Sequence, residues 1–297
     1  MTARSHLAGI IPVAGLKTDY DIATPEYLLP VDPGFTAIQK VVYECALAGC
    51  QTIWIVANGD TAPIIRTIIG EWIYDPVYFS NPHIRFSSEH RREIPIYYAP
   101  IHPKDRDRRD SYGWSILHGI NSAWRTATRI SKWVVPDKYY VSFPMNAHNV
   151  YNIRRQRLKI SDTTKNWFMT HEGKTVKDNI PLPFTMFGQD YIHCRRHVNK
   201  QTTRQFLNPP PGEMPTEKLP LHERWSARHF DFEEIFDAVC TTDAHMERAD
   251  WFYDITTWEG YKSFLGSENF IKKPINDLIK SHSHVRLPYK EGEIDDD

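Results

Sequence analysis

The sequence predicts an α/β protein in which helices cover both faces of a mostly parallel central sheet. Short apolar runs typical of buried strands alternate with longer segments whose apolar residues recur at helical spacing, and turn formers separate them. Strands that alternate with helices usually pair in parallel, because each helix returns the chain to the edge where the next strand begins. We therefore expect a three-layer sandwich.

The first 70 residues show this alternation most clearly. Residues 7–13 form a short apolar run typical of a buried strand, and residues 35–45 place their apolar side chains on one helical face. Gly49 stands where a helix would end. Thr52–Ala57 is β-branched and aromatic, and residues 58–60 supply a turn and an N-cap for an isoleucine-rich helix. The pattern predicts a βαβ beginning.

The rest of the chain continues the pattern less regularly. We expect strands at 94–99, 139–143 and 184–187, and helices whose apolar residues span 116–130 and 231–240. The proline-rich stretch 208–220 is predicted to be an exposed excursion, and 291–297 a solvated acidic tail. Residues 1–290 are predicted to form a single domain.

Composition excludes several classes of protein. Of the 297 residues, 41% are hydrophobic and 25% charged, which is typical of a folded protein, and the net charge of -1 attracts no nucleic acid or anionic membrane. The four cysteines form no CxxC pair, which favours the reducing cytoplasm. No apolar stretch approaches the ~18 residues of a membrane span. We expect a cytoplasmic protein that contacts neither nucleic acid nor membrane.

The N-terminal segment carries a resemblance to a known family. Residues 11–70 open IPVAGLKTDYDIATPEYLLPVDPG and continue through VVYECALAG to IWIVANG. They resemble the bacterial UTP:glucose-1-phosphate uridylyltransferases, which are sugar-1-phosphate nucleotidyltransferases with an opening IPVAGLGTR, then PK, a VVxEC-like helix, an AG turn and an IVT-like strand. The resemblance implies the nucleotidyltransferase fold, which is GT-A-like and Rossmann-like, with a nucleotide at the carboxyl ends of the parallel strands.

Three weaker matches follow in the same order along the chain. Gly113 resembles the GLGHA segment near the family's base-binding site. Lys174 stands fourteen residues before Gly188, the separation between the family's EKP lysine and the glycine of its next motif. Asp254 lies in YDITTWEGY, which resembles the family's YDIGNKLGY. The resemblance therefore extends over most of the chain.

The resemblance implies a reaction and a set of site residues. A sugar-1-phosphate oxygen attacks the α-phosphorus of a nucleoside triphosphate and displaces pyrophosphate, while Mg²⁺ holds the reacting groups in line. The ligands would be a nucleoside triphosphate or a nucleotide sugar. The implied residues are Ala14, Gly15, Leu16 and Gly113 for the nucleotide, Lys174 and Gly188 for the sugar phosphate, Lys17 and Lys174 for catalysis, and Asp254 and Asn146 for the metal.

The sequence departs from the family at several charged positions. Lys17 replaces the glycine of GTR, Asp19 its arginine and Glu26 the lysine of PK, so two cations become two anions. At an effective dielectric of ~20, each like-charge pair at ~4 Å costs roughly 4 kcal/mol. Met145 replaces the aspartate of the LPD segment, and a thioether is a poor ligand for Mg²⁺.

Three interpretations follow from these residues. In a divergent enzyme, Lys17 and the basic cluster Lys104, Arg106, Arg108 and Arg109 would neutralise the phosphates. In a catalytically silent relative, the fold would serve binding or structure, as a homo-oligomer or with a protein partner. A GT-A glycosyltransferase would use an Asp-x-Asp motif, for which residues 19–21 and 105–107 are the available pairs.

Overall fold

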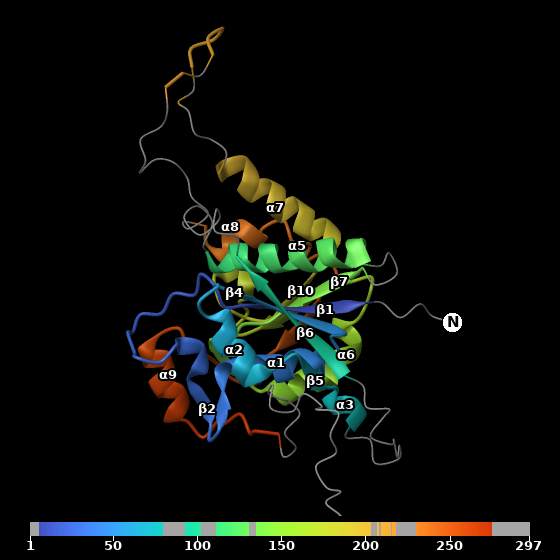
Figure 1. Cartoon of the computed structure of the whole chain (residues 1–297), viewed down its shortest axis with the longest axis vertical. Helices are drawn as coiled ribbons and strands as arrows, with labels where there is room; N and C mark the ends of the chain where they lie inside the picture. The colour runs from blue at the N-terminus through green and yellow to red at the C-terminus, as the bar shows by residue number, and fades with distance from the viewer. Residues whose placement is uncertain are drawn as a thin grey trace, which may run out of the picture.

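The computed structural model describes residues 6–79, 93–101, 111–130, 135–202, 207, 209–214, 216–217 and 230–274. Its main sheet contains β1 (Leu7–Pro12), β4 (Thr52–Ala57), β5 (Trp72–Tyr74), β6 (Glu93–Pro100), β7 (Lys138–Val141), β9 (Trp167–Thr170), β10 (Phe184–Phe187) and β11 (His245–Arg248). These 8 strands lie in the order β11-β9-β10-β7-β1-β4-β6-β5 (Figure 1). β10 and β5 run antiparallel to their neighbours, and the other pairs are parallel.

Helices lie on both faces of this sheet. They are α1 (Ala37–Ala48), α2 (Ala62–Ile69), α3 (Pro76–Phe79), α5 (Tyr112–Ile130), α6 (Val150–Ile160), α7 (Gly188–Thr202), α8 (Phe232–Phe236) and α9 (Trp258–Leu265). Figure 1 shows α5, α7 and α8 on one face and α1, α2, α6 and α9 on the other. The expected three-layer α/β sandwich is confirmed.

Four short strands and two 3-10 turns complete the described elements. β2 (Pro30–Asp32) pairs with β3 (Phe35–Thr36), and β8 (Asn146–His148) pairs with β12 (Phe252–Asp254). The 3-10 turns span Glu26–Leu28 and Val176–Asp178. The β8 and β12 pair matters for the site, because it joins the segment after β7 to the segment before α9.

Alternation along the central strands divides the core into two layers. In β4, Ile53 and Ile55 pack with the α1 side chains, whereas Trp54 and Val56 pack with those of α5. Full burial of one such side chain contributes about 1.5–3 kcal/mol. Both faces of the sheet are therefore apolar, as a sheet covered by two helical layers requires.

Local signals placed both ends of β4 and β10 correctly, whereas the helix expected over 231–240 is shorter and spans Phe232–Phe236. Thr36 and Gln39 form a capping box at the start of α1, and Gly49 ends the helix with φ at 95°, which confirms the expected stop. The N-cap expected within 58–60 is wrong by one residue: Thr61 is the N-cap of α2. The turn itself is present, since the Asn58 carbonyl accepts from the N–H groups of residues 61 and 62.

Some expectations concern residues outside the described ranges. The acidic tail 291–297 and the basic cluster Lys104, Arg106, Arg108 and Arg109 lie there, as do residues 208, 215 and 218–220 of the proline-rich stretch. The other residues of that stretch, 209–214 and 216–217, are exposed. The single-domain boundary at residue 290 also stays a prediction. Among the helices that the structure describes, none combines the length and the apolar character needed to cross a membrane.

A buried lysine joins α1 to the end of β7. The Lys40 ammonium lies 3.2 Å from the Phe143 carbonyl oxygen, 2.9 Å from the Asn146 carbonyl oxygen and 2.5 Å from Asn146 Oδ1. The side chain is completely buried, and burial lowers the pKa of Lys40 to about 8. The ammonium is therefore still largely charged at neutral pH and holds residues 143–146 against α1.

A carboxylate one helical turn later completes this network. Glu44 Oε1 accepts hydrogen bonds of 2.6 Å from the hydroxyls of Tyr140 and Ser142, and Glu44 Oε2 lies 3.7 Å from the Lys40 ammonium and 3.4 Å from His148 Nε2. Burial alone would raise the pKa of Glu44, but His148 and Lys40 outweigh it and lower the pKa to about 2. The pair thus stays ionised inside the core.

Removing the Lys40 cation should be costly. We expect Lys40→Met to lower the free energy of unfolding by about 3–5 kcal/mol, because it leaves buried oxygens and the Glu44 carboxylate without their cation. Urea denaturation measures the loss. Lys159→Met is the control, since its exposed pair with Glu247 should contribute under about 1 kcal/mol. Equal losses in both variants would contradict a structural role for Lys40.

Candidate active site at the carboxyl edge of the sheet

Most of the residues implied by the sequence meet at one edge of the sheet. Ala14 to Lys17 follow β1, Asn146 opens β8 just after β7, and Lys174 follows β9, which runs in the same direction as β7. Asp254 ends β12 and is the direct ladder partner of Asn146. The two residues expected to bind a metal are therefore neighbours, at the carboxyl ends of the parallel strands.

The turn after β1 is fixed by the strand and helix beside it. The N–H groups of Val13 and Ala14 both donate to the Val56 carbonyl, at 2.8 and 2.9 Å, and the Ser115 hydroxyl donates to the Ala14 carbonyl at 2.6 Å. Gly15 then adopts φ of 77°, a conformation that glycine reaches without strain. The Ala14 N–H is thus already hydrogen-bonded within the protein.

The segment after this turn is attached to the start of α9. The Trp258 N–H, at the first residue of α9, donates to Asp19 Oδ1 at 2.6 Å, and the Asp19 N–H donates to the Thr256 carbonyl at 3.1 Å. The Tyr20 hydroxyl donates to the Ile255 carbonyl at 2.8 Å. A carboxylate is stabilised at a helix N-terminus by its unpaired N–H groups and dipole. Asp19 therefore has a structural contact here.

The second anion of this segment also has a local partner. The Thr18 hydroxyl lies 3.3 Å from Glu26 Oε1 and 3.0 Å from the Tyr20 carbonyl, so residues 18 to 26 are cross-linked within the loop. Lys17 is exposed. The loop consequently presents one exposed cation beside the carboxylates of Asp19, Asp21 and Glu26.

Gly113 lies under α8. A Cβ atom added at Gly113 would stand 2.4 Å from Ile235 Cδ1, so the glycine permits close packing of α5 against α8. The Phe232 ring of α8 lies 5.8 Å from the ring of Tyr112 and 5.3 Å from that of Phe143. Aromatic side chains of α8 thus cover this face of the β7 end and the start of α5.

The two expected metal residues have different partners. Asn146 is completely buried, with Oδ1 facing the Lys40 ammonium and Nδ2 donating to the Pro181 carbonyl at 2.6 Å. Asp254 is half-buried, and its Oδ1 accepts from the Thr256 N–H at 3.0 Å and hydroxyl at 2.7 Å. Asp254 is thus the anionic oxygen ligand that this pair can offer to Mg²⁺, whereas the Asn146 oxygen already faces a cation.

Asp254 influences a buried phenol beside Gly113. Burial raises the pKa of Tyr112 well above its usual value, and the negative charge of Asp254 raises it further. In the described part of the chain the Tyr112 hydroxyl is buried without a hydrogen-bond partner. The neutral phenol is therefore close enough to be influenced by the carboxylate, but it is covered by protein.

Lys174 is exposed in a turn after β9. Its backbone N–H and carbonyl exchange hydrogen bonds with His171, at 2.9 and 3.0 Å, and its side chain is open to solvent. Lys17 and Lys174 therefore lie at the same edge of the sheet, and neither side chain is buried.

Gly188 lies at the opposite edge of the sheet. It follows Phe187, which pairs with Lys138 at the start of β7, and Lys138 pairs with Leu7 at the start of β1. A strand of six residues separates the two edges by about 20 Å, at ~3.3 Å a residue. The structure thus separates Gly188 from the other implied residues.

Comparisons with known proteins agree with the fold. The sequence matches no protein-family model and no curated protein. A candidate glucose-1-phosphate thymidylyltransferase from Bacillus anthracis, solved with sucrose, superposes with a TM-score of 0.55 at 12% identity over 90% of this chain and 98% of that one. The likeness shows a shared fold, with a mixed sheet that is mostly parallel.

Two further solved structures superpose less closely. A nucleoside-diphosphate-sugar pyrophosphorylase from Vibrio cholerae gives a TM-score of 0.45 at 13% identity, covering 87% of this chain and 100% of that one. A UTP-bound UGPase from Acinetobacter baumannii gives 0.43 at 14% identity, covering 88% and 92%.

Proposed function

We propose that this chain is a relative of the sugar-1-phosphate nucleotidyltransferases that binds a nucleotide sugar at the carboxyl edge of its sheet but does not catalyse nucleotidyl transfer. The shared fold and the order of the motifs support the relationship. The contact between Asp19 and the N-terminus of α9 carries the second part of the proposal.

That contact opposes binding of a triphosphate. Asp19 stands where the resemblance puts a phosphate-binding arginine, and its carboxylate is held in place by the Trp258 N–H. Glu26 stands where a lysine would be, and it is tied into the same loop by Thr18. Two fixed anions raise the energy of a bound polyanion. The exposed Lys17 offsets one of them.

A nucleotide sugar fits this edge better than a nucleoside triphosphate. It carries less negative charge, so it suffers less repulsion from the two carboxylates. Asp254 would hold a Mg²⁺ ion whose remaining ligands come from the diphosphate and water, and the cation would neutralise diphosphate charge. Lys174 and Lys17 would approach the sugar and phosphate groups from solvent.

Two other functions remain as outcomes of the test. A divergent nucleotidyltransferase would use the same edge, and the pairing of Asp254 with Asn146 is the observation that favours it. A GT-A glycosyltransferase would need an Asp-x-Asp motif. In the first candidate motif, Asp19 already accepts a hydrogen bond from the first residue of α9. Residues 105–107, the second candidate motif, lie outside the described ranges.

The transfer reaction is tested directly with the purified chain. We expect no release of pyrophosphate from UTP and glucose-1-phosphate in the presence of Mg²⁺, because the triphosphate is repelled, and no glucose transfer or release from UDP-glucose. In the same buffer, UDP-glucose should raise the melting temperature more than UTP does. Enzyme-catalysed pyrophosphate release would contradict the proposal and establish the divergent enzyme, and glucose release would establish the glycosyltransferase.

The metal assignment is tested with Asp254→Asn. The amide oxygen can still accept from Thr256, so the fold and the melting temperature of the free protein should be retained, while the charge that would hold Mg²⁺ is lost. At a hundredfold excess over Kd, UDP-glucose with Mg²⁺ should stabilise the unsubstituted chain by about 2.7 kcal/mol. In the variant we expect the Mg²⁺-dependent part of this stabilisation to disappear.

The control for this experiment is Asp243→Asn. Asp243 is exposed and precedes β11, at the other edge of the sheet, so its replacement should leave the Mg²⁺-dependent stabilisation unchanged. An Asp254→Asn variant that keeps the full Mg²⁺ effect would remove Asp254 from the metal site.

A further inference from the structure

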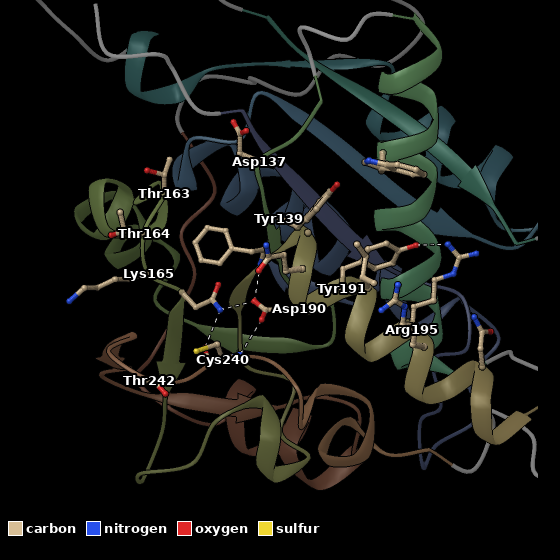
Figure 2. Close-up of a pocket in the computed structure, with 18 residues that line it drawn as sticks. Asp137, Tyr139, Thr163, Thr164, Lys165, Asp190, Tyr191, Arg195, Cys240 and Thr242 are labelled. Atoms are coloured by element: carbon tan, nitrogen blue, oxygen red, sulfur yellow. Dashed lines mark hydrogen bonds between the residues drawn. The ribbon is translucent and has the colours of Figure 1, made fainter.

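A second cavity lies at the amino edge of the sheet, away from the proposed nucleotide site. It has a volume of about 940 Å³ and is lined by residues of α5 and α7, by the start of β7 and by the residues before β9. Figure 2 shows Arg195 beside Tyr191 on the α7 side of the cavity, with Asp137 and Lys165 well away from it. The cavity is large enough for a small organic molecule.

The Arg195 guanidinium is held between the two helices. Its Nη1 donates to Asn121 Oδ1 of α5 and to the Tyr191 hydroxyl, each at 2.7 Å. The Tyr191 hydroxyl donates in turn to Asn121 Oδ1 at 3.1 Å. Arg195 is only partly buried, and within the described part of the chain its Nε and Nη2 have no partner. These oriented N–H groups are therefore available to a ligand in the cavity.

Two further arginines lie close to Arg195. Arg196 is exposed at the next position of α7 and also lines the cavity. Arg125 follows Asn121 by one helical turn on α5. Burial raises the pKa of Tyr191, while the positive charges of Arg195 and Arg125 oppose that rise, so both cations lie near the same phenol. Among the described residues, no carboxylate pairs with any of the three arginines.

The acidic residues near the cavity do not neutralise this end. α5 contains no aspartate or glutamate. Asp190 of α7 is buried, and its Oδ2 accepts from Asn166 Nδ2 at 2.9 Å and from the Phe187 N–H at 3.1 Å. Asp137 and Lys165, away from the arginines, carry opposite charges (Figure 2). The α7 end of the cavity therefore favours an anion, which guanidinium groups bind through charge-assisted hydrogen bonds.

Exposed apolar side chains stand one helical turn from the guanidinium. α5 leads to the start of β7 at the amino edge, whereas α7 begins at that edge, so the two helices are antiparallel and the contact between Arg195 and Asn121 sets their register. One turn closer to the amino edge, α5 presents Trp124 and α7 presents Ile192. Both line the cavity, and they are 46% and 43% exposed. An indole at this position favours a flat apolar ring.

We propose that this cavity binds a small aromatic monoanion, whose negative group pairs with Arg195 and Arg196 and whose ring packs against Trp124 and Ile192. One helical turn, about 5 Å, separates the two pairs of side chains. A carboxylate attached directly to an aromatic ring matches this separation. The site lies at the opposite edge from the proposed nucleotide site and does not depend on it.

Three probes of similar size test the assignment by isothermal titration calorimetry on the full chain. The first, 2-naphthoate, carries a flat ring system and a carboxylate. The second, 2-naphthalenemethanol, has the same rings without the charge, and the third, decahydro-2-naphthoate, keeps the charge on a saturated, puckered ring system. We expect 2-naphthoate to bind about tenfold more tightly than the alcohol and severalfold more tightly than the saturated acid. Equal affinity of either analogue, or no binding of 2-naphthoate, would overturn the proposal.

Substitution of Trp124 localises the ring. Because Trp124 is 46% exposed, Trp124→Ala should leave the protein folded and weaken 2-naphthoate binding severalfold. Trp258→Ala is the matched control, since Trp258 is also 46% exposed but lies on α9, on the other face of the sheet (Figure 1). Unchanged 2-naphthoate affinity in Trp124→Ala would place the ligand elsewhere and contradict the proposal.

Substitution of Arg196 localises the anion. We expect Arg196→Gln to weaken 2-naphthoate severalfold and to leave 2-naphthalenemethanol unaffected. Arg154→Gln, which removes another exposed cation from α6 on the opposite face, should change neither affinity. Equal losses of 2-naphthoate affinity in the two variants would show an effect of net charge alone and would contradict the assignment of the anion to α7.

Discussion

The buried ammonium of Lys40 holds the carboxyl edge of the sheet together. It draws three oxygens of Phe143 and Asn146 onto α1, and Glu44 on the same helix binds the hydroxyls of Tyr140 and Ser142. The end of β7 and the start of β8 are thereby fixed relative to β1. Because β8 pairs with β12, the position of Asp254 depends on the same contact. A protein cation thus organises the place where a metal is proposed to bind.

Polar and charged side chains at this edge of the sheet are hydrogen-bonded to other parts of the protein. Asp19 and Glu26 stabilise the loop after β1 through α9 and Thr18, and Asn146 turns its oxygen to Lys40. Gly113 also contacts protein, because Ile235 packs closely over it. Residues at positions that the resemblance assigns to phosphate, metal and base have internal partners here, which is why we propose binding of a less charged ligand without transfer.

The sequence predicted the central part of the fold well and the flanks poorly. The boundaries of β4 were correct because its six residues form a β-branched, aromatic run followed by a turn, and α1 carried both a capping box and a terminal glycine. β9 and β11 were missed. His245–Arg248 contains a single apolar residue, Met246, so its sequence carries no strand pattern, and pairing with Trp167–Thr170 decides its conformation.

The site was predictable only in part for a similar reason. The topology brought Ala14 to Lys17, Asp254 and Asn146 to one edge, as the order of strands and helices implied. The partners of those side chains depend on contacts between distant segments, such as Asp19 with Trp258 and Lys40 with Asn146. A lysine and a glutamate four residues apart in a mostly apolar helix were the available signal for the second contact.

Titration of UTP into a charge-reversed protein tests the central electrostatic claim most directly. The variant carries Asp19→Arg and Glu26→Lys, and Asp19→Ala with Glu26→Ala is the control that removes the loop contacts without adding cations. With Mg²⁺ at low salt, the account predicts that the charge-reversed protein binds UTP at least about tenfold more tightly than the unsubstituted chain, about 1.4 kcal/mol, and more tightly than the control. Equal UTP affinities in all three proteins would contradict it.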